Sequence, residues 1–513
     1  MRYSLAPGAA ALAFVALCAS SARAQGLDPT PASQCGERVV TVQPDSAVAD
    51  SRVLIRFAAG LASDTDDAFL ARALGTLVAE RIRQTLSLDV RSRGFSGGSG
   101  SASAASAVAE GRVLGVRYVL VGTVQRRDDR SVIDWRLVDA RSGKQTSSGT
   151  ASEPVGAVDS LVNAMTSVMT RALGRTASRP AARDRLHSRS PSAILSFLRG
   201  LAEAEAFDRA RLQSAARALQ RAIELDRSFI AARYRLAELS VRQLDWVEHG
   251  DRARALLVQT GLWSIGAVLL KEPYDPPALA LMGRLYLHKG TPALAQPIVA
   301  SLRTLAPDDP ATVELDARVA RALGHDEDAL NIVRASASAT ERSIDALMVR
   351  ADLERRVGDR VVACRVLNRA ISLDATHAPA YVWRAIVRST LGELREGWGD
   401  AEVASRLGRA DWGELTGALI DVAVRDTVRA RTRVKPLMTP SSLDSAGWLD
   451  LVLRAAVANS LTTPAAAQQA ILRISCRDPR RIGLSNEPLL RYLRLPSNCV
   501  GGIAAIRRDG SSG

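Results

Sequence analysis

One short pattern in the sequence could carry catalysis. Residues Gly94-Phe-Ser-Gly-Gly98 match the G-x-S-x-G arrangement that surrounds a nucleophilic serine. Such a serine needs a histidine base within hydrogen-bond reach, and no histidine precedes His187. The stretch 94–106 is also rich in glycine and serine, so it does not favour a fixed turn. We interpret it as a loop and expect no enzyme. A hydrolase would require that Ser96→Ala abolish an activity.

Patterns for phosphate and metal binding are incomplete. No Gly-Lys-Ser/Thr follows the glycines, so they do not form a P-loop. Asp64, Asp66 and Asp67 begin like a calcium loop, but the required glycine and glutamate are missing, and we interpret them as caps of a following helix. We expect no metal and no cofactor. The histidines, which show no metal-ligand spacing, are His187, His249, His288, His325 and His377.

A third set of residues could bind a partner protein. Arginines pair with carboxylates and an exposed tryptophan anchors apolar groups, so these residues would suit an acidic or extended peptide. The alternative is a solvated face of mixed charge, and the sequence leaves both open. The candidate groove residues are Arg284, His288, Glu314, Arg318, Arg321, Asp352, Arg355 and Trp383, with Ile386 beside them.

These residues lie in a stretch that repeats. Glycine recurs at Gly290, Gly324, Gly358 and Gly392, at intervals of 34 residues, and other small residues keep the same period. This pattern resembles the tetratricopeptide repeat, a helix–turn–helix unit whose helices approach closely where side chains are small. The resemblance implies an all-α, right-handed superhelical solenoid that binds proteins. The candidate groove residues would then line its first helices.

The repeats place the domain boundaries of the second half. Regular repeats are expected to begin near residues 276, 310, 344 and 378, within a solenoid over 192–410. Two less regular repeats precede them, and a helical cap over 411–513 follows, since terminal repeats drift from the consensus. Residues 175–191 contain Pro180, scattered serines and arginines, and are predicted to be a linker.

Residues 51–174 predict an α/β domain with the element order β-α-β-α-β-β-β-α. The region resembles the amino-terminal domain of the TolB type. The likeness rests on Asp66-Asp-Ala-Phe-Leu-Ala-Arg-Ala-Leu74, Ala109-Glu-Gly-Arg-Val-Leu-Gly-Val-Arg-Tyr-Val-Leu-Val-Gly-Thr-Val124 and Trp135-Arg-Leu-Val-Asp-Ala-Arg-Ser-Gly-Lys144. Arg56 departs from it, because the family has proline before this phenylalanine. The resemblance implies an envelope or sensory scaffold and no catalysis.

The first residues have the features of a secretory signal peptide. Arg2 is followed by the apolar run Ala9–Ala19 and by Ala22-Arg-Ala24, an A-x-A cleavage site. We expect a signal peptide over 1–24, cleavage after Ala24 and an exported leader over 25–50. No other segment reaches the length of a membrane span, so we expect a protein exported to the periplasm or cell envelope of a bacterium.

Export changes how the cysteines are interpreted, because the compartment is oxidising. Cys476 and Cys499 lie close in sequence, and we predict a disulfide between them. Cys364 falls in the second helix of a repeat and is predicted to be a buried small hydrophobic residue. Cys35 remains without an assigned role.

The formal net charge of +14 is carried almost entirely by arginine, since the chain of 513 residues contains only four lysines. No basic block of five residues occurs, and we expect no nucleic acid partner. The sequence therefore predicts a non-enzymatic exported scaffold that binds a protein or peptide. The alternative is a sensory or regulatory protein whose α/β domain binds a ligand and signals through the solenoid.

Overall fold

The computed structural model describes most of the chain from the first strand to the last helix. The chain forms two compact units, Met1–Thr41 and Val42–Gly513, and of the first only Cys35 is described. The expected signal peptide, the expected leader apart from Cys35, and Ser96 lie outside the described residues. These are 35, 52–59, 65–86, 89–92, 104–113, 116–174, 186, 188, 190–204, 209–246, 251–407, 410–439, 448–461, 466, 467 and 470.

The first part of the second unit is a five-stranded mixed sheet with the strand order β2-β1-β3-β4-β5. β1 (Arg52–Ala59) pairs in parallel with β2 (Asp89–Ser92) and with β3 (Tyr118–Arg127). β4 (Arg130–Asp139) and β5 (Gln145–Pro154) continue the sheet antiparallel. Short turns join the antiparallel strands, whereas helices connect the parallel ones. The predicted order β-α-β-α-β-β-β-α is confirmed.

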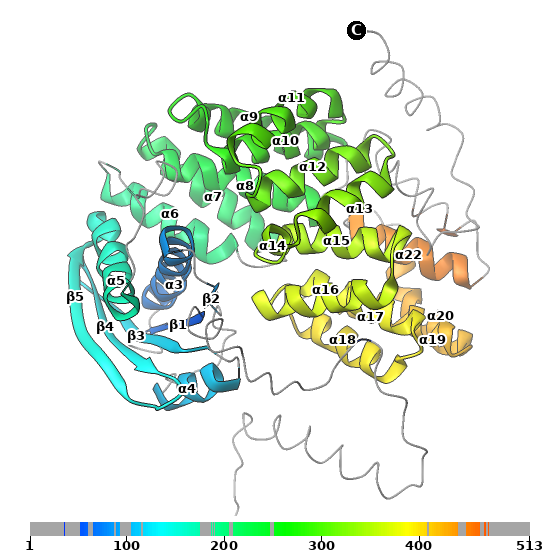
Figure 1. Cartoon of the computed structure of the whole chain (residues 1–513), viewed down its shortest axis with the longest axis horizontal. Coiled ribbons are helices and arrows are strands. Elements are labelled where there is room, and N and C mark those ends of the chain that lie inside the picture. The colour runs from blue at the N-terminus through cyan, green and yellow to red at the C-terminus, as the bar shows by residue number, and fades with distance from the viewer. Residues whose placement is uncertain are drawn as a thin grey trace, which may run out of the picture. The chain divides into compact units, whose positions relative to one another are not determined.

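Helices cover both faces of this sheet (Figure 1). Because side chains alternate along a strand, Ile55 packs on the face of α3 (Thr65–Leu86) and α5 (Val158–Leu173). Leu54 points to the opposite face and packs with α4 (Ala104–Val113). The sheet is therefore buried on both sides at β1 and β3, which explains their nearly continuous apolar sequence. A short 3-10 turn, η2 (Val155–Ala157), precedes α5.

The rest of the unit is a run of paired helices (Figure 1). The predicted solenoid is confirmed. Its helices are α6 (Pro191–Ala204), α7 (Arg209–Leu225), α8 (Ile230–Trp246), α9 (Asp251–Leu269), α10 (Pro276–Lys289), α11 (Pro292–Leu305), α12 (Pro310–Ala322), α13 (Asp326–Ala335), α14 (Ala337–Thr340), α15 (Ile344–Val357), α16 (Arg360–Leu373), α17 (Ala378–Thr390), α18 (Leu394–Arg406), α19 (Ala410–Ala423), α20 (Thr427–Val434), η4 (Lys435–Met438) and α22 (Trp448–Ser460).

The first helices of the regular repeats begin at Pro276, Pro310, Ile344 and Ala378, 34 residues apart. Capping side chains fix three of these starts, and at α15 the hydroxyl of Ser343 accepts the N–H of Ala346 at 3.3 Å. The carboxylate of Asp309 accepts the N–H of Ala311 at 2.8 Å, and proline follows it at the first helical position, where no donor is lost. Asp275 caps α10 in the same way, accepting from the N–H of Ala278 at 3.3 Å.

The repeated glycines do two different jobs. Gly290, Gly324 and Gly392 have φ angles of 82°, 87° and 82°, which side chains rarely adopt, and they end their helices in the left-handed conformation. Gly358 has a φ of −108° and needs glycine for another reason. A Cβ there would overlap a carboxylate oxygen of the buried Glu354. The same repeat position therefore requires glycine for two different physical reasons.

The sheet and the first solenoid helices share one hydrophobic core, because α3 packs against α6 as well as against the sheet. The rings of Phe197 and Phe229, on α6 and before α8, lie 5.0 Å apart within this core. Leu186, inside the predicted linker 175–191, is buried in it, and its N–H donates to Asp159 at 3.4 Å. The α/β part is thus packed directly onto the solenoid.

The cysteines differ in part from expectation. Cys364 on α16 is buried as predicted, but it forms a disulfide, so its interpretation as a simple hydrophobic residue is wrong. Cys35 is also buried and disulfide-bonded. Cysteine spacing alone does not show which cysteines are bonded, which explains the miss at Cys364. The predicted bridge between Cys476 and Cys499 lies outside the described residues.

Among the described helices, none has the length and apolar character that a membrane crossing requires.

Candidate functional site

The candidate groove residues lie on α10, α12, α15 and α17, the first helices of the regular repeats. We call these helices, together with α8, the inner helices, and the surface that they form the inner surface. Each of the helices α8, α10, α12 and α15 contacts the next in this series. The structure brings the predicted residues together in two clusters. Arg284, His288, Glu314 and Arg318 belong to the first, and Arg321, Asp352, Arg355 and Trp383 belong to the second.

The first cluster surrounds Asp245 of α8, and we call it the Asp245 network. Arg284 donates to Asp245 at 2.5 Å, and the Nε2 of His288 lies 2.9 Å from the same carboxylate. Arg318 donates to Glu314 at 2.7 Å, one turn along α12, and its guanidinium lies 3.9 Å from Asp245. Arg284 and His288 thus join neighbouring inner helices, whereas Arg318 of α12 approaches α8 across α10.

Arg284 connects helices that are far apart in sequence. Besides Asp245, its guanidinium donates to Asp345 at 3.0 Å and lies 3.3 Å from Glu314. Burial alone would raise the pKa of Asp245, but Arg284, Arg318 and His288 outweigh it and hold that pKa well below the usual value. The ionised carboxylate of Asp245 is therefore matched by cations of this chain, as a buried charge requires, whereas burial raises the pKa of Glu314.

The second cluster surrounds Asp352 of α15, and we call it the Asp352 network. Its carboxylate accepts from Arg321 at 2.6 Å, from Arg355 at 2.7 Å and from Arg356 at 3.1 Å. Burial favours a raised pKa for Asp352, yet the three guanidinium groups outweigh it and depress that pKa strongly. The Asp352 network thus contains one negative charge and three positive charges.

Two of the arginines remain partly accessible. The side chains of Arg318 and Arg321 are 21% and 17% exposed and lie three residues apart on the same face of α12. Burial lowers the pKa of Arg321, Asp352 opposes this, and the charges of Arg356 and Arg318 lower it further. Arg318 and Arg321 therefore repel each other at the edge of the inner surface.

Trp383, predicted as an apolar anchor, has only 6% of its surface exposed. The guanidinium of Arg355 stacks over its ring at 4.4 Å from the centroid. Ile386, one turn further along α17, is also buried. An anchor for a partner needs an accessible ring, so the structure places Trp383 in the packing between α15 and α17.

Three members of these networks were missed from the sequence: Asp245, Asp345 and Arg356. A signal was available for one class of contact. Glu314 follows Arg284 by about one repeat, and Asp352 follows Arg321 by 31 residues. Opposite charges nearly one repeat apart predict ion pairs between neighbouring inner helices, and both of these pairs are present. Asp245 lies in an irregular repeat, where this spacing does not apply.

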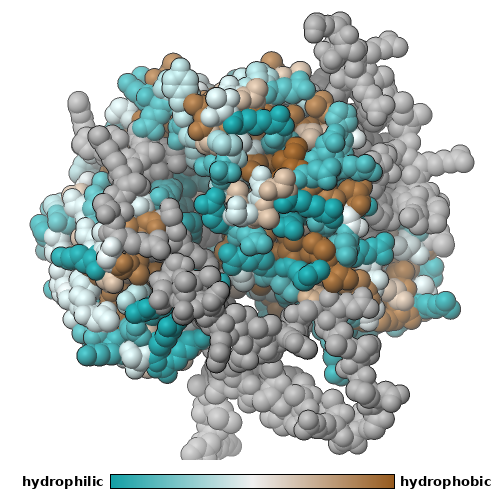
Figure 2. Space-filling model, in the orientation of Figure 1, coloured by the Kyte–Doolittle hydropathy of each residue, from teal (hydrophilic) through white to brown (hydrophobic). Residues whose placement is uncertain are grey.

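A second concave feature lies between α11, α12 and α13. It is an open groove of about 560 Å³. Val299, Val319 and Ile332 contribute apolar surface, and Arg303 makes a two-point ion pair with Asp316 at 2.8 and 2.9 Å beside them. Figure 2 shows hydrophobic residues over the solenoid helices broken up by hydrophilic ones.

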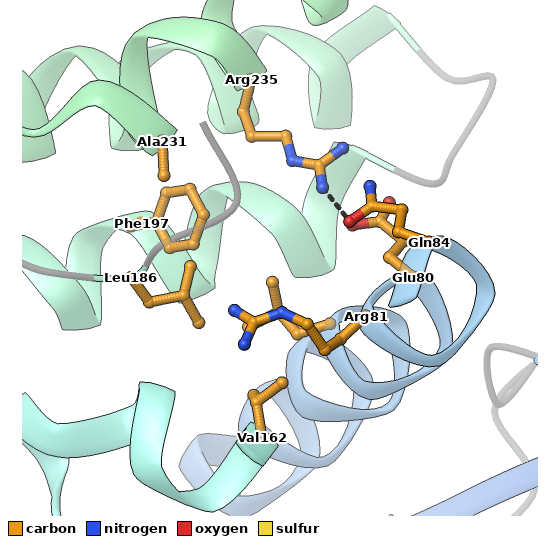
Figure 3. A pocket seen from close by; sticks show the side chains of 9 residues that line it. Glu80, Arg81, Gln84, Val162, Leu186, Phe197, Ala231 and Arg235 are labelled. Atoms are coloured by element: carbon orange, nitrogen blue, oxygen red, sulfur yellow. Dashed lines mark hydrogen bonds and ion pairs between the residues drawn. The ribbon is translucent and has the colours of Figure 1, made fainter. Parts of the chain in front are cut away.

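A third feature is the junction between the α/β part and the solenoid. Arg235 of α8 forms an ion pair with Glu80 of α3 (Figure 3), and Arg81 of α3 donates to Asp159 of α5 at 2.8 Å. The cavity among these side chains measures about 10 Å³. Since a single water needs about this volume, the cavity holds no organic ligand.

The described residues contain no group of three or more histidine, cysteine or acidic side chains that could hold a metal ion. Of the five histidines, three are described. His288 is engaged by Asp245, His325 is exposed on the turn before α13, and burial lowers the pKa of His377.

Comparison with protein-family models finds no match, and comparison with curated proteins finds none either. Among solved structures, the chain is similar to the APC/C hetero-tetramer Cut9–Hcn1, with 12% identity over 63% of this chain and 71% of that chain and a TM-score of 0.33. It is similar to the human IFIT1 dimer with PPP-AAAA, with 11% identity, 62% and 78% coverage and a TM-score of 0.41.

A tetratricopeptide repeat protein from Parabacteroides merdae shares 17% identity over 50% of this chain and 97% of that chain, with a TM-score of 0.34. At such identities these likenesses concern the fold alone. The paired helices with 34-residue spacing form a solenoid of the tetratricopeptide type. This fold generally mediates protein–protein interaction through its extended surface.

Proposed function

We propose that this chain is an exported, non-enzymatic scaffold of the bacterial cell envelope whose solenoid binds an acidic, extended segment of a partner protein. The observation that carries the proposal is the pair of partly exposed side chains of Arg318 and Arg321. They lie on one face of α12, and their charges oppose each other. A carboxylate from a partner, placed between them, offsets that repulsion.

The two networks limit which residues serve the partner. Arg284 and Arg355 are nearly buried and hold carboxylates of this chain, so we assign them to the structure of the inner surface. Arg318 and Arg321 can each bind a carboxylate of the partner while keeping their ion pairs with Glu314 and Asp352. Guanidinium–carboxylate contacts at such a partly desolvated edge are stronger than contacts in open solvent.

Export is supported by the features of residues 1–24 and by the disulfides. Cys35 and Cys364 are both disulfide-bonded, and such bonds persist in oxidising compartments such as the periplasm. The resemblance of residues 51–174 to the TolB amino-terminal type points to the same compartment. Export with cleavage predicts that the mature protein begins at Gln25, which mass spectrometry of the purified protein measures.

The binding site is tested with a labelled hexa-aspartate peptide and fluorescence anisotropy on the purified full chain. We expect saturable binding that weakens with added salt, and a loss of about tenfold in affinity for Arg321→Gln, because one charge-assisted contact disappears. Arg303→Gln is the matched control, since Arg303 lies on α11 and pairs with Asp316. Equal affinity for Arg321→Gln and the unmodified chain would refute the assignment of the site.

A sensory role is the alternative, and one observation favours it. The core shared by α3 and α6, together with the ion pair between Arg235 and Glu80, links the α/β part to the solenoid without a spacer. A ligand that shifts α3 would therefore shift α6 and α8. This function requires saturable binding of a small molecule to the α/β part, and the absence of such binding favours the scaffold.

A further inference from the structure

The second helix of an irregular repeat, α9, exposes an apolar stripe. Leu256 and Trp263 of α9, and Leu270 directly after it, are 63%, 58% and 84% exposed. They are spaced by seven residues, which places them on one side of the helix, two turns apart. Large apolar side chains this exposed, in one line on one helix, mark an interaction surface rather than scattered surface residues.

The opposite side of α9 is fixed in the solenoid core. Val258, Ile265 and Val268 are buried against helices α8 and α10. At Gly261 a Cβ would come within 2.6 Å of the side chain of Leu285, so the two helices pack closely there. Since this face is fixed, α9 cannot rotate to bury its exposed stripe. A helix that is apolar on both sides is typical of one that is covered on both sides.

Trp263, at the centre of the stripe, is held in place. The guanidinium of Arg233 lies 4.4 Å from the centroid of its ring. Arg233 is itself oriented by the carbonyl oxygen of Arg227, to which it donates at 2.8 and 3.2 Å. A rigid, half-exposed tryptophan loses little conformational entropy on binding, and tryptophan is the residue most enriched at interface hot spots.

Next to Trp263 along the stripe is a gap. Gly266 lies three residues further on, and a Cβ built there would meet no atom within 4 Å. The stripe thus offers one large projecting ring and, less than one turn away, a position without a side chain. The ring of Trp263 on one copy can therefore fit over Gly266 on a second copy, and the reverse holds at the same time. An isologous interface requires such self-complementarity, because the same patch serves both partners.

We propose that α9 is the interface between two copies of this chain, packed antiparallel about a two-fold axis near Trp263. Trp263 is the midpoint of the stripe, so the symmetry places Leu256 of one copy opposite Leu270 of the second. Each Trp263 then packs over Gly266 of the other copy. The antiparallel arrangement also opposes the two helix dipoles favourably.

The charge pattern favours a protein over a membrane surface as the occupant. From residue 255 to residue 270 the chain contains no charged residue. Interface centres are depleted of charge in this way. Helices that lie on membranes instead carry lysine and arginine along the polar face, beside the apolar stripe. The indole of Trp263 is also stacked on Arg233, which suits packing against a helix better than insertion among lipids.

Sedimentation velocity of the purified full chain over a range of concentrations tests the proposal. We expect a monomer–dimer equilibrium that Leu270→Glu weakens by about tenfold or more, because it buries a charge without a partner. Val428→Glu, at an exposed apolar residue of α20, is the matched control and keeps the dimer.

Gly266→Leu separates the interface from folding. It meets open space in the single chain and replaces a poor helix former, so the fold is kept, but it fills the gap that receives Trp263. We expect a folded monomer. A dimer that persists in both Gly266→Leu and Leu270→Glu, or a wild-type chain that stays monomeric at every concentration, overturns the proposal. Monomers that bind anionic vesicles through Trp263 overturn it as well.

Discussion

The arginines on the inner helices of the solenoid differ in how much each contributes to stability. Arg284 contacts three carboxylates on three helices, and two of these, Asp245 and Glu314, are almost completely buried. Arg321 contacts Asp352. If Arg321 is removed, Asp352 is still paired with Arg355 and Arg356. The cost of removing an arginine therefore depends on what remains beside its carboxylate, and less on the bond that is lost.

We predict that Arg284→Ala lowers the free energy of unfolding by about 3–5 kcal/mol, because it leaves buried carboxylates with fewer cations. Arg321→Ala should cost about 1 kcal/mol or less, since Asp352 stays paired. Urea unfolding followed by circular dichroism measures both. Similar losses for the two variants would contradict the roles that we assign to them.

The depressed pKa values of Asp245 and Asp352 predict how stability depends on pH. Carboxylates whose folded pKa lies below the unfolded value of about 3.9 stabilise the fold above that value and lose this contribution as the pH falls through the folded pKa. The melting temperature should therefore be insensitive to these groups between pH 7 and about 5 and should fall below about pH 4.

The variant Asp352→Asn tests whether Asp352 causes the loss of stability at low pH. The variant should be less stable at neutral pH, because three guanidinium groups lose their shared anion, and it should lose less than the unmodified chain on further acidification. Asp328→Asn, at an exposed carboxylate of α13, should behave like the unmodified chain. If the melting temperature of Asp352→Asn falls at low pH as much as that of the unmodified chain, Asp352 is not the cause.

At the scale of the element, small residues decide how closely the inner helices approach. Gly283 of α10 faces Leu315 of α12, and a Cβ there would overlap that buried side chain. Gly283→Ala should therefore destabilise the protein by about 1–3 kcal/mol through overpacking. Gly399→Ala on α18 has open space and should stabilise it by about 0.5–1 kcal/mol, because alanine favours helices. Thermal unfolding separates the two, and equal signs would contradict the packing argument.

Much of the architecture could be predicted from the sequence. The 34-residue period reports contacts within a repeat and between neighbours, which explains why helix starts such as Pro310 and Ile344 were placed correctly. The order of the α/β elements followed from alternating apolar residues and turn signals. The short helix α14, inserted between α13 and α15, has no counterpart in the period and was missed.

The candidate site could be predicted only in part, for a physical reason. The residues that would line the inner helices were identified, but their partners were not. Asp245 of α8 and Asp345 of α15 both reach Arg284 of α10, although α8 and α15 belong to different repeats. A repeat period reports contacts between neighbouring units, so a contact between residues 61 positions apart could not be inferred from spacing.

At the scale of the whole molecule, the α/β part and the solenoid share packing through α3 and α6. A scaffold benefits from this arrangement, because a partner held on α12 keeps a defined place relative to the sheet. The inner surface is reinforced by its own ion pairs, which leaves Arg318 and Arg321 as the accessible cations that we assign to a partner.

The most direct test of this account is capture of the partner in living cells. The chain is crosslinked, purified and analysed by mass spectrometry, beside the variants Arg321→Gln and Arg303→Gln. We predict that one envelope protein with an acidic segment is captured by the unmodified chain and by Arg303→Gln, and is lost from Arg321→Gln although that variant stays folded. Capture that survives in Arg321→Gln but is lost from Arg303→Gln would contradict the account and would place the partner in the open groove between α11, α12 and α13.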